Sequence, residues 1–428
     1  MADFDSIVAG AGCAGSAAAT VLARAGKSVL LVDRGTDAGA KNMTGGRIYV
    51  HSLREVFPDF EDDAPLERRI TCERISLLTD DAATTIEYAS PALGAPENAS
   101  YAVLRGPFDR WLAGQAEKAG AECVFGITVE GLVRDGGRIC GIRAGSDEIT
   151  AEVTILADGA NSLLVEEAGL GKRPQPHQMA VSAKETIALP PEVIDDRFRA
   201  APGEGTAWLF AGDSTAGHVG GGFLYTNKDS VSIGLVATLS DLCTSEVPLP
   251  TLLERFKHHP AVEPVLRGGK LVEYSGHMVP EGGLAMVPEL VADGCLVAGD
   301  AAMLCVNLGY QVRGMDYAIA SGRMAAESAI EALEAGSTSA SALGGYRDRL
   351  EQSFVLRDMR AYQRFPEFME HTTRIFDTYP AMASDMMRSL FVVDGSPVQP
   401  LRKKMMEPVR RVGLMTVLGD LRKGMKAL

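Results

Sequence analysis

The sequence predicts an α/β protein in which a Rossmann-like dinucleotide-binding domain is interrupted by a β-rich (α+β) domain and followed by a helical C-terminal region. Three observations predict this fold class. A strand, a glycine turn and a helix follow one another at 5–25, a second strand and glycine turn precede residue 300, and aromatic and charged residues recur at helical spacing over 346–379. We expect the dinucleotide-binding domain at 1–170 and 291–340, with a strand insertion near 70–100, the β-rich domain at 171–290 and the helical region at 341–428.

A glycine turn between the first predicted strand, 5–9, and the following helix is typical of dinucleotide-binding proteins. Gly10 allows the tight turn, Gly12 lets the backbone approach a diphosphate, and Gly15 lets the helix pack closely on the strand. The helix N-terminus, with its unpaired N–H groups, favours the negative charge of the diphosphate. The other candidate cofactor-binding residues of this turn are Cys13 and Ala14.

A second strand and an acidic residue complete the βαβ unit. Gly26 ends the helix, the strand runs over 27–32, and Asp33 follows at its carboxyl end. A carboxylate in this place accepts hydrogen bonds from both hydroxyls of an adenosine ribose and disfavours a 2′-phosphate. Arg34 is the neighbouring candidate for cofactor binding. This unit alone does not distinguish FAD from NAD.

Residues 294–302 predict a second turn of the same site. A short apolar strand leads into Gly299 and Asp300, and a helical run follows. The pattern resembles the ribityl-binding motif of FAD enzymes, in which a carboxylate accepts a hydrogen bond from the sugar-alcohol chain of the flavin. An aspartate that caps a helix after a strand gives the same short pattern. Together with the N-terminal unit, however, the motif predicts FAD as the cofactor.

The stretch after the second turn predicts a contact with the flavin ring. Asn307, Leu308 and Gly309 are expected to place a helix N-terminus near the N1 and O2 edge of the flavin, where negative charge gathers on reduction. A long helix of small residues is then expected to reach about Ala335.

Two segments between the turns resemble motifs of glutathione-reductase-like flavoproteins of the hydroxylase branch, in which a β-rich substrate domain interrupts the FAD domain. They are LRxxxDxxL at 104–112 and ILADGANS at 155–162. The resemblance implies that Arg105 lies near the pyrophosphate. It also places Asp158 and Gly159 beside the cofactor, where the chain re-enters the large domain. Val129 is a further candidate for cofactor binding.

Four longer strings carry a sharper resemblance that covers nearly the whole chain. They are KNMTGGR at 41–47, GGFLYTN at 221–227, HxxPEGG at 277–283 and NLGxxxRGMD at 307–316. These strings resemble the FixC-like flavoproteins, which are related to electron-transfer flavoprotein:quinone oxidoreductases. The resemblance implies an FAD-dependent electron carrier. It implies that electrons come from the two-subunit electron-transfer flavoprotein and that a small ferredoxin-like iron-sulfur protein is a partner.

The seven cysteines limit what this resemblance implies. They are widely scattered, without a CxxC pair or a Cys/His cluster, so no metal or iron-sulfur site is predicted. Full-length quinone oxidoreductases of this family carry a cluster held by closely spaced C-terminal cysteines, whereas FixC relies on a separate small protein. The sequence therefore leaves open whether this chain reduces a quinone.

The net charge of −14 argues against a nucleic-acid partner, because a polyanion needs clustered Lys and Arg. The scattered thiols and the lack of a signal peptide before the first strand indicate the reducing cytoplasm. No apolar stretch reaches the roughly 18 residues that span a bilayer. Any membrane contact is therefore expected to be peripheral, at the inner face.

The loop 41–47 has two interpretations. It is either a polar connection or backbone packed on a flat ring, and its adjacent glycines favour contact with the flavin. Asn42 and Thr44 are the expected hydrogen-bonding residues. The other cofactor-binding candidates of this loop are Lys41 and Gly45.

Two further residues have simpler structural interpretations. His277 is expected to be a buried core histidine, so no catalytic role is assigned to it. Cys13 is small enough for packing alone, and a redox role would need a second thiol nearby.

The segment 402–428 carries eight basic and two acidic residues, so its net charge of +6 contrasts with −20 for the rest of the chain. Methionine, valine and leucine are interleaved with the basic residues. A solvated helix on the main body, a membrane-facing surface and a docking site for an acidic partner remain open interpretations.

Three other functions share the predicted fold. They are a flavin monooxygenase acting on an aromatic acid, a flavin-dependent reductase of prenyl lipids, and a non-catalytic FAD-binding assembly subunit. No second strand–GxGxxG–helix unit follows Asp33, so a separate pyridine-nucleotide domain is not expected. The leading prediction is an electron-transfer flavoprotein dehydrogenase.

Overall fold

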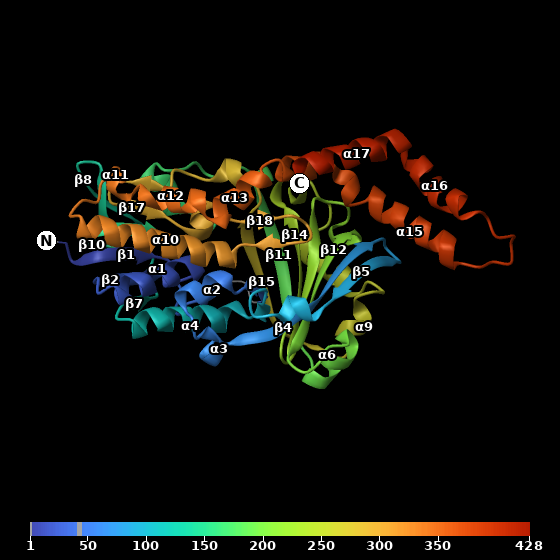
Figure 1. Ribbon diagram of the computed structural model, residues 1–428, viewed down its shortest axis with the longest axis horizontal. Helices are drawn as coiled ribbons and strands as arrows, with labels where there is room; N and C mark the ends of the chain where they lie inside the picture. The colour runs from blue at the N-terminus through green and yellow to red at the C-terminus, as the bar shows by residue number, and fades with distance from the viewer. Residues whose placement is uncertain (1, 41–44) are drawn as a thin grey trace.

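The computed structural model describes residues 2–40 and 45–428 and contains two large sheets (Figure 1). In the first sheet, β1 (Phe4–Ala9) lies between β10 (Asp147–Leu156) and β2 (Val29–Asp33) and pairs with both in parallel. The last four residues of β1 are all buried, as expected for a strand covered on both faces. The other strands joined to this sheet are β7 (Glu122–Phe125), β8 (Gly131–Asp135), β9 (Arg138–Ala144), β16 (Val291–Ala292) and β17 (Cys295–Val297).

Helices α1 (Cys13–Arg24) and α10 (Met315–Glu334) pack on each other beside the first sheet. Their contact is close because Gly322 of α10 faces the backbone of Ala14, and a Cβ at position 322 would lie 2.1 Å from the Ala14 carbonyl oxygen. Only glycine fits there. The first glycine turn and the region after residue 300 are thereby held together. The other helices of this part are α2 (His51–Val56), α3 (Phe60–Asp63), α4 (Arg105–Lys118), α5 (Leu163–Ala168) and α11 (Ala340–Leu343).

The second sheet has nine strands, and its segments are interleaved in sequence with those of the first. In order across the sheet these are β15 (Lys270–Pro280), β11 (Met179–Ala188), β14 (Ser230–Thr238), β13 (Gly220–Thr226), β12 (Glu204–Gly212), β4 (Leu66–Leu78), β6 (Ser100–Val103) and β3 (Gly46–Tyr49), with β5 (Ala83–Ala89) paired to β4. Four of its strands, β3 to β6, come before residue 104, and the other five come after β10. The second sheet is therefore built from segments that precede and follow strands β7 to β10 of the first sheet in sequence. The domain boundaries given above stay a prediction, whereas the α/β fold class is confirmed.

The two faces of the second sheet follow the two-residue period of a strand. In β12, Trp208 and Phe210 point toward a cluster with Phe256 of helix α8 (Leu249–Lys257). The alternate residues Leu209 and Ala211 line a cavity on the opposite face. One face is therefore a packed core, and the other is free to bind a ligand. The remaining helices of this part are α6 (Pro191–Phe198), α7 (Leu239–Leu242) and α9 (Glu263–Leu266).

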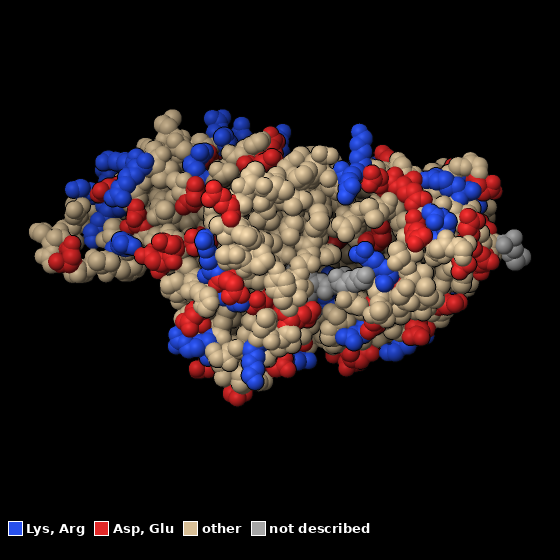
Figure 2. All heavy atoms as spheres, turned by 180° about the vertical axis from the view of Figure 1, so that it is seen from behind, with Lys and Arg blue, Asp and Glu red and all other residues tan. Residues whose placement is uncertain are grey.

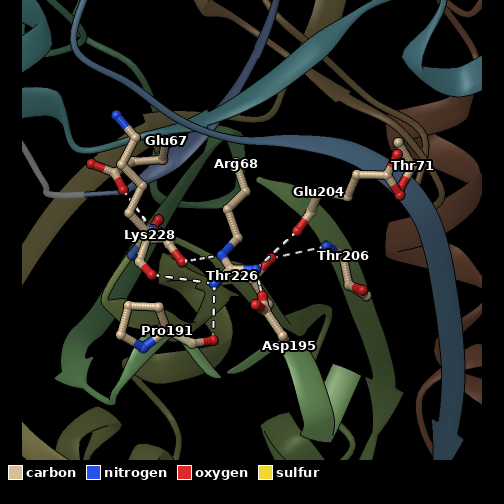
Figure 3. Close-up of polar contacts among 10 residues, drawn as sticks. Glu67, Arg68, Thr71, Pro191, Asp195, Glu204, Thr206, Thr226 and Lys228 are labelled. Atoms are coloured by element: carbon tan, nitrogen blue, oxygen red, sulfur yellow. Dashed lines mark hydrogen bonds and ion pairs between the residues drawn. The ribbon is translucent and has the colours of Figure 1, made fainter. Parts of the chain in front are cut away.

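A buried arginine joins the strands of the second sheet at one end (Figure 3). The Arg68 guanidinium forms an ion pair with Asp195 and donates hydrogen bonds to several backbone carbonyls. The distances are 2.6 Å to the Asn227 oxygen, 3.1 Å to Glu204 and 3.2 Å to Lys228. Because the side chain is almost fully buried, these contacts replace water around its charge. Arg68 thus connects β4, β12, α6 and the turn after β13.

The C-terminal helices form a cover and a projecting arm (Figure 1). Helix α12 (Gly345–Gln352) packs on α10, and α17 (Leu414–Ala427) is fixed by Asp420, which accepts hydrogen bonds from Arg374 and Tyr379. Two helices, α15 (Thr378–Phe391) and α16 (Leu401–Val412), run side by side away from the body. The predicted helical C-terminal region is confirmed. Its other helices are α13 (Phe354–Ala361) and α14 (Phe365–His371).

Membrane-spanning helices and metal-binding clusters are both absent from the described residues. Within 2–40 and 45–428, no helix combines the length and apolar character needed to cross a bilayer. Over the same residues, no group of three or more His, Cys, Asp or Glu side chains is arranged to hold a metal ion.

Candidate functional site

A cavity of about 1010 Å³ lies between the carboxyl end of the first sheet and the inner face of the second. Most of the predicted cofactor-binding residues line it. Gly15 and Gly299 do not line it and instead pack within the wall, while Lys41, Asn42 and Thr44 lie outside the described residues. The predicted residues that line the cavity are Gly10, Gly12, Cys13, Ala14, Asp33, Arg34, Gly45, Arg105, Val129, Asp158, Gly159, Asp300, Asn307, Leu308 and Gly309.

The N-terminal glycine turn leaves open space where a diphosphate would lie. A Cβ at Gly12 would meet no protein atom within 4 Å, so the backbone there is exposed to the cavity. Gly10 has φ of 110° and lies against the Ala157 carbonyl, where a Cβ would come within 2.2 Å. The turn thus needs glycine at residue 10 for its shape and at residue 12 for its ligand. The N-terminus of α1 faces the same space.

Asp33 is oriented by the backbone around it. One carboxylate oxygen accepts a hydrogen bond from the Ala11 N–H at 2.9 Å, and the other accepts one from the Gly35 N–H at 2.6 Å. These bonds hold the carboxylate at the cavity wall. Each oxygen keeps a lone pair with which it can accept a hydrogen bond from a ribose hydroxyl.

Arg105 supplies a fixed positive charge to the cavity. Its guanidinium forms two hydrogen bonds of 2.9 Å with Asp109, which is fully buried. Burial alone would lower the pKa of Arg105, but the neighbouring carboxylate outweighs burial and raises it. Arg105 therefore stays charged and rigidly placed, as the binding of a diphosphate requires.

Cys13 lies beside the Arg105–Asp109 pair. Its thiol donates a weak hydrogen bond to Asp109 at 3.8 Å, and burial raises its pKa to about 12. A thiol in this state is not a nucleophile at neutral pH.

Two acidic residues line the middle of the cavity. Burial raises the pKa of Asp158 to about 6, and its Oδ1 atom has no hydrogen-bond partner among the described residues. Burial also raises the pKa of Asp300, whereas the nearby Arg105 and His277 act in the opposite direction. A buried carboxylate oxygen without a partner costs free energy that a ligand hydroxyl or amide would recover. Both residues are thus suited to a polar ligand.

The structure corrects two predictions in this region. His277 is not a core residue: it lines the cavity beside Asp300, and burial lowers its pKa. No helix begins at 307–310. Instead, β18 (Val306–Asn307) and β19 (Val312–Arg313) form a short hairpin, and α10 begins at Met315. The hairpin turn is closed by a 3.0 Å bond from the Gly309 N–H to the Asn307 side chain, a local contact that competes with helix formation.

Sequence reasoning missed Lys184, which contacts the cavity-lining Gly45 from the protein interior, and Glu281, which lines the cavity itself. Lys184 is fully buried, donates a hydrogen bond to the Gly45 carbonyl oxygen, and has its pKa lowered by burial. Glu281 lies directly after β15 and lines the cavity. A charged residue within the mostly small and apolar strand 179–188 is the signal that marks Lys184. Glu281 is the acidic residue of the HxxPEGG string at 277–283, and this is the signal that marks it.

These residues fit FAD. The glycine turn and Arg105 suit a diphosphate, Asp33 suits an adenosine ribose, and Asp300 suits a sugar-alcohol chain. The cavity continues past these groups to the inner face of the second sheet. When bound, the flavin supplies the group that accepts and donates electrons.

Three family models match separate parts of the chain. A model described as FAD dependent oxidoreductase matches residues 5–170. A model described as ETF-QO, ubiquinone-binding matches 205–279, which contributes much of the inner face of the second sheet. A model described as ETF-QO/FixC family C-terminal domain matches 365–428.

Solved structures with low sequence identity share the fold. A geranylgeranyl bacteriochlorophyll reductase-like protein from Thermoplasma acidophilum has a TM-score of 0.71 at 22% identity, with 98% of this chain and 99% of that chain covered. The myxobacterial halogenase CndH has a TM-score of 0.64 at 17% identity, with 97% and 90% covered. These likenesses concern the fold alone.

Curated relatives are much more similar in sequence. A probable electron transfer flavoprotein-quinone oxidoreductase, YdiS of Escherichia coli (strain K12), is 51% identical over 425 residues, with 99% of both chains covered. The protein FixC of Salmonella typhi is 49% identical over the same length and coverage. Identity at this level over the whole length, together with the fold and the FAD-shaped cavity, shows that the chain belongs to the FixC and electron transfer flavoprotein-quinone oxidoreductase family of FAD-dependent oxidoreductases.

Proposed function

We propose that this protein accepts electrons from a two-subunit electron-transfer flavoprotein and passes them through FAD to a quinone. The observation that carries the proposal is the continuous cavity. It runs from the glycine turns to the inner face of the second sheet, where Leu209 and Phe223, with Phe365 of α14, offer apolar surface to a quinone ring. The match of 205–279 to the ubiquinone-binding model and the names of the curated relatives support the same reaction.

Within this proposal, each group of cavity residues binds one part of FAD. Gly10, Gly12 and Arg105 bind the diphosphate, Asp33 binds the adenosine ribose, and Asp300 binds the sugar-alcohol chain. The flavin ring is bound by Gly45 and the hairpin turn, with Lys41, Asn42 and Thr44 as further proposed contacts. The other proposed contacts are Cys13, Ala14, Gly15, Arg34, Val129, Asp158, Gly159, Gly299, Asn307, Leu308 and Gly309.

Stopped-flow reduction of the bound flavin tests the electron donor. Reduced electron-transfer flavoprotein is expected to bleach the flavin absorbance much faster than NADH or NADPH does. Rapid, saturable reduction by NADPH that an aromatic acid stimulates would instead establish a monooxygenase. Subsequent mixing with a short-chain ubiquinone should restore the absorbance, and failure to do so would remove quinone as the acceptor.

The projecting arm supports a position at a membrane surface. Val393 and Val398 in the connection between α15 and α16 are exposed by 88% and 89%, and Phe391 at the end of α15 is exposed by 77%. Lys and Arg lie on the same projecting end together with Asp and Glu, on the left in Figure 2. Apolar side chains beside basic ones suit an anionic lipid surface. We therefore propose that the tip 391–401 contacts the membrane in which the quinone is dissolved.

Sedimentation with vesicles of phosphatidylglycerol and phosphatidylcholine tests this contact. Val393→Asp combined with Val398→Asp should reduce the bound fraction, because it places two carboxylates at the lipid interface. Val272→Asp, at a similarly exposed apolar position on β15, is the control and should not reduce it. Equal binding by both variants would contradict the proposal.

A ferredoxin-like iron-sulfur protein is the second proposed electron acceptor. The basic segment 402–428 favours it, since an acidic partner is attracted to a net charge of +6. Arg422 and Lys423 are exposed on α17. The double variant Arg422→Glu/Lys423→Glu should bind the purified partner more weakly, and its binding should depend less on salt concentration. Lys118→Glu on α4 should change neither property. Unchanged, salt-insensitive binding by the double variant would exclude this surface.

A further inference from the structure

Glu281 lies at a junction of three segments in the cavity wall. Its Oε2 atom accepts a hydrogen bond from the Thr238 hydroxyl at 3.0 Å, and its backbone N–H donates to the Gln178 carbonyl oxygen at 2.7 Å. The carbonyl of the preceding Pro280 accepts a hydrogen bond from the Cys305 thiol at 3.1 Å. The carboxyl group is thus fixed in position, with Thr238 and Asn307 beside it in the same wall.

Glu281 differs from two other glutamates of the second sheet, the buried Glu185 and the half-buried Glu73. Glu185 forms an ion pair with Lys257 at 2.7 Å, and Glu73 is paired with Arg47. For Glu281, no ion pair with a Lys, Arg or His occurs within the part of the chain that the structure describes. A buried carboxylate without a cation is costly, so the group holds its proton more tightly. A carboxyl group of this kind in a ligand cavity is more typical of proton transfer than of structural support.

The surroundings of Glu281 keep its proton available near neutral pH. Burial and, to a smaller extent, Asp241 on α7 raise its pKa, hydrogen bonds from Thr238 and Asn307 lower it, and the resulting pKa is about 7. The Cys305 thiol also lies nearby, and burial together with Asp300 and Glu281 raises its pKa beyond the neutral range. Near pH 7 Glu281 is therefore the group in this corner that gains and loses a proton.

The reaction under "Proposed function" requires such a group. A quinone that receives two electrons from the reduced flavin must bind two protons, one on each oxygen, before it leaves as a quinol. Leu209 and Phe223 add apolar surface to the cavity, which reduces the contact of a bound ring with water. A carboxylic acid at the wall can give one of these protons and then regain it from solvent, and solvent supplies the other proton, so the protein undergoes no net change.

We propose that Glu281 holds and delivers a proton to a quinone oxygen in this cavity. The inference rests on the proposed quinone reduction. The alternative is that Glu281 serves only to connect the ends of β14 and β15 through Thr238. Glu281→Gln separates the two roles, because the amide oxygen still accepts the Thr238 hydrogen bond but the side chain cannot transfer a proton.

Turnover with two acceptors tests the proposal in the FAD-loaded protein. With a short-chain ubiquinone, Glu281→Gln should lower kcat by about 10²-fold, the usual contribution of a positioned acid. With ferricenium, which takes up an electron without a proton, kcat should stay unchanged. The fall in quinone turnover of the wild-type protein above pH 7 should be absent from the variant. Equal loss with both acceptors, or no loss with quinone, would overturn the proposal.

Infrared spectroscopy provides a measurement that does not depend on activity. A carboxylic acid C=O band should titrate near pH 7 in the wild-type protein and be missing in Glu281→Gln. Glu67→Gln is the matched control: burial raises the pKa of Glu67 too, and it accepts a hydrogen bond from the Lys228 N–H at 2.7 Å, but it does not line the cavity. If the wild-type protein reduces no quinone, the proposed function fails, and a missing band in the wild-type protein overturns the assignment to Glu281.

Discussion

The two walls of the cavity are built by different means. On the first sheet, the ligand-facing surface combines backbone, at the glycines 10 and 12 and the N-terminus of α1, with carboxylates that follow strand ends. On the second sheet it consists of side chains that alternate along strands, such as Leu209 on β12 and Phe223 on β13. The first surface is formed by short contiguous motifs, whereas the second is formed by strands from separate segments of the sequence. The first wall therefore suits a constant cofactor, and the second a variable substrate.

The largest expected effect breaks the first wall. Gly12→Val should abolish FAD binding, because the side chain would fill the space that the diphosphate needs. The measurement is flavin absorbance per chain after purification. Gly114→Val, in α4, is the control, since a side chain there also meets no neighbour but lies outside the cavity. Full FAD occupancy in Gly12→Val would show that the diphosphate lies elsewhere.

The next effect tests how the second wall is supported. Arg68→Ala should lower the free energy of unfolding by about 3–5 kcal/mol, because Asp195 would keep a charge without its partner. Chemical denaturation measures this change. The exposed Arg110→Ala should have an effect below about 1 kcal/mol. If Arg68→Ala also lowered the free energy of unfolding by less than about 1 kcal/mol, this would mean that water replaces the guanidinium.

The third prediction concerns how the stability of the protein depends on pH through Glu281. The pKa of Glu281 is raised by burial to about 7 in the folded protein, so its ionisation destabilises the fold as pH rises from about 4.5 to 7. Glu281→Gln removes this loss. Relative to wild type, the variant should therefore gain up to roughly 3 kcal/mol over that window and then stay level. Thermal unfolding at a series of pH values measures the gain, and parallel curves for the two proteins would contradict it.

The smallest expected effect concerns one hydrogen bond of the first wall. Asp300→Ala should weaken FAD binding by about 1.5–3 kcal/mol, the scale of a hydrogen bond to a charged group. Fluorescence titration of the FAD-free protein gives the dissociation constant. Asp135→Ala, exposed on β8, should leave it unchanged. An unaltered affinity in Asp300→Ala would remove Asp300 from the cofactor site.

Features formed by residues close in sequence could be predicted from the sequence, whereas features that join distant segments could not. The strand, turn and helix expected at 5–25 are observed as β1 and α1, because their contacts are local. Arg68 and Lys184 could not be predicted, since their partners Asn227 and Gly45 are 159 and 139 residues away. The hairpin at 306–313 replaced an expected helix start because a turn closed by the Asn307 side chain was not recognised.

The parallel pairing of β4 with β12 has a consequence for synthesis of the chain. Residue 69 pairs with residue 204, so β4 must wait for a partner that is made much later. At about 5–20 residues per second, the ribosome needs roughly 7–27 s to reach it. During that interval the edge of β4 that β12 will cover is open to other chains, and a chaperone that shields nascent strands would raise the yield of folded protein.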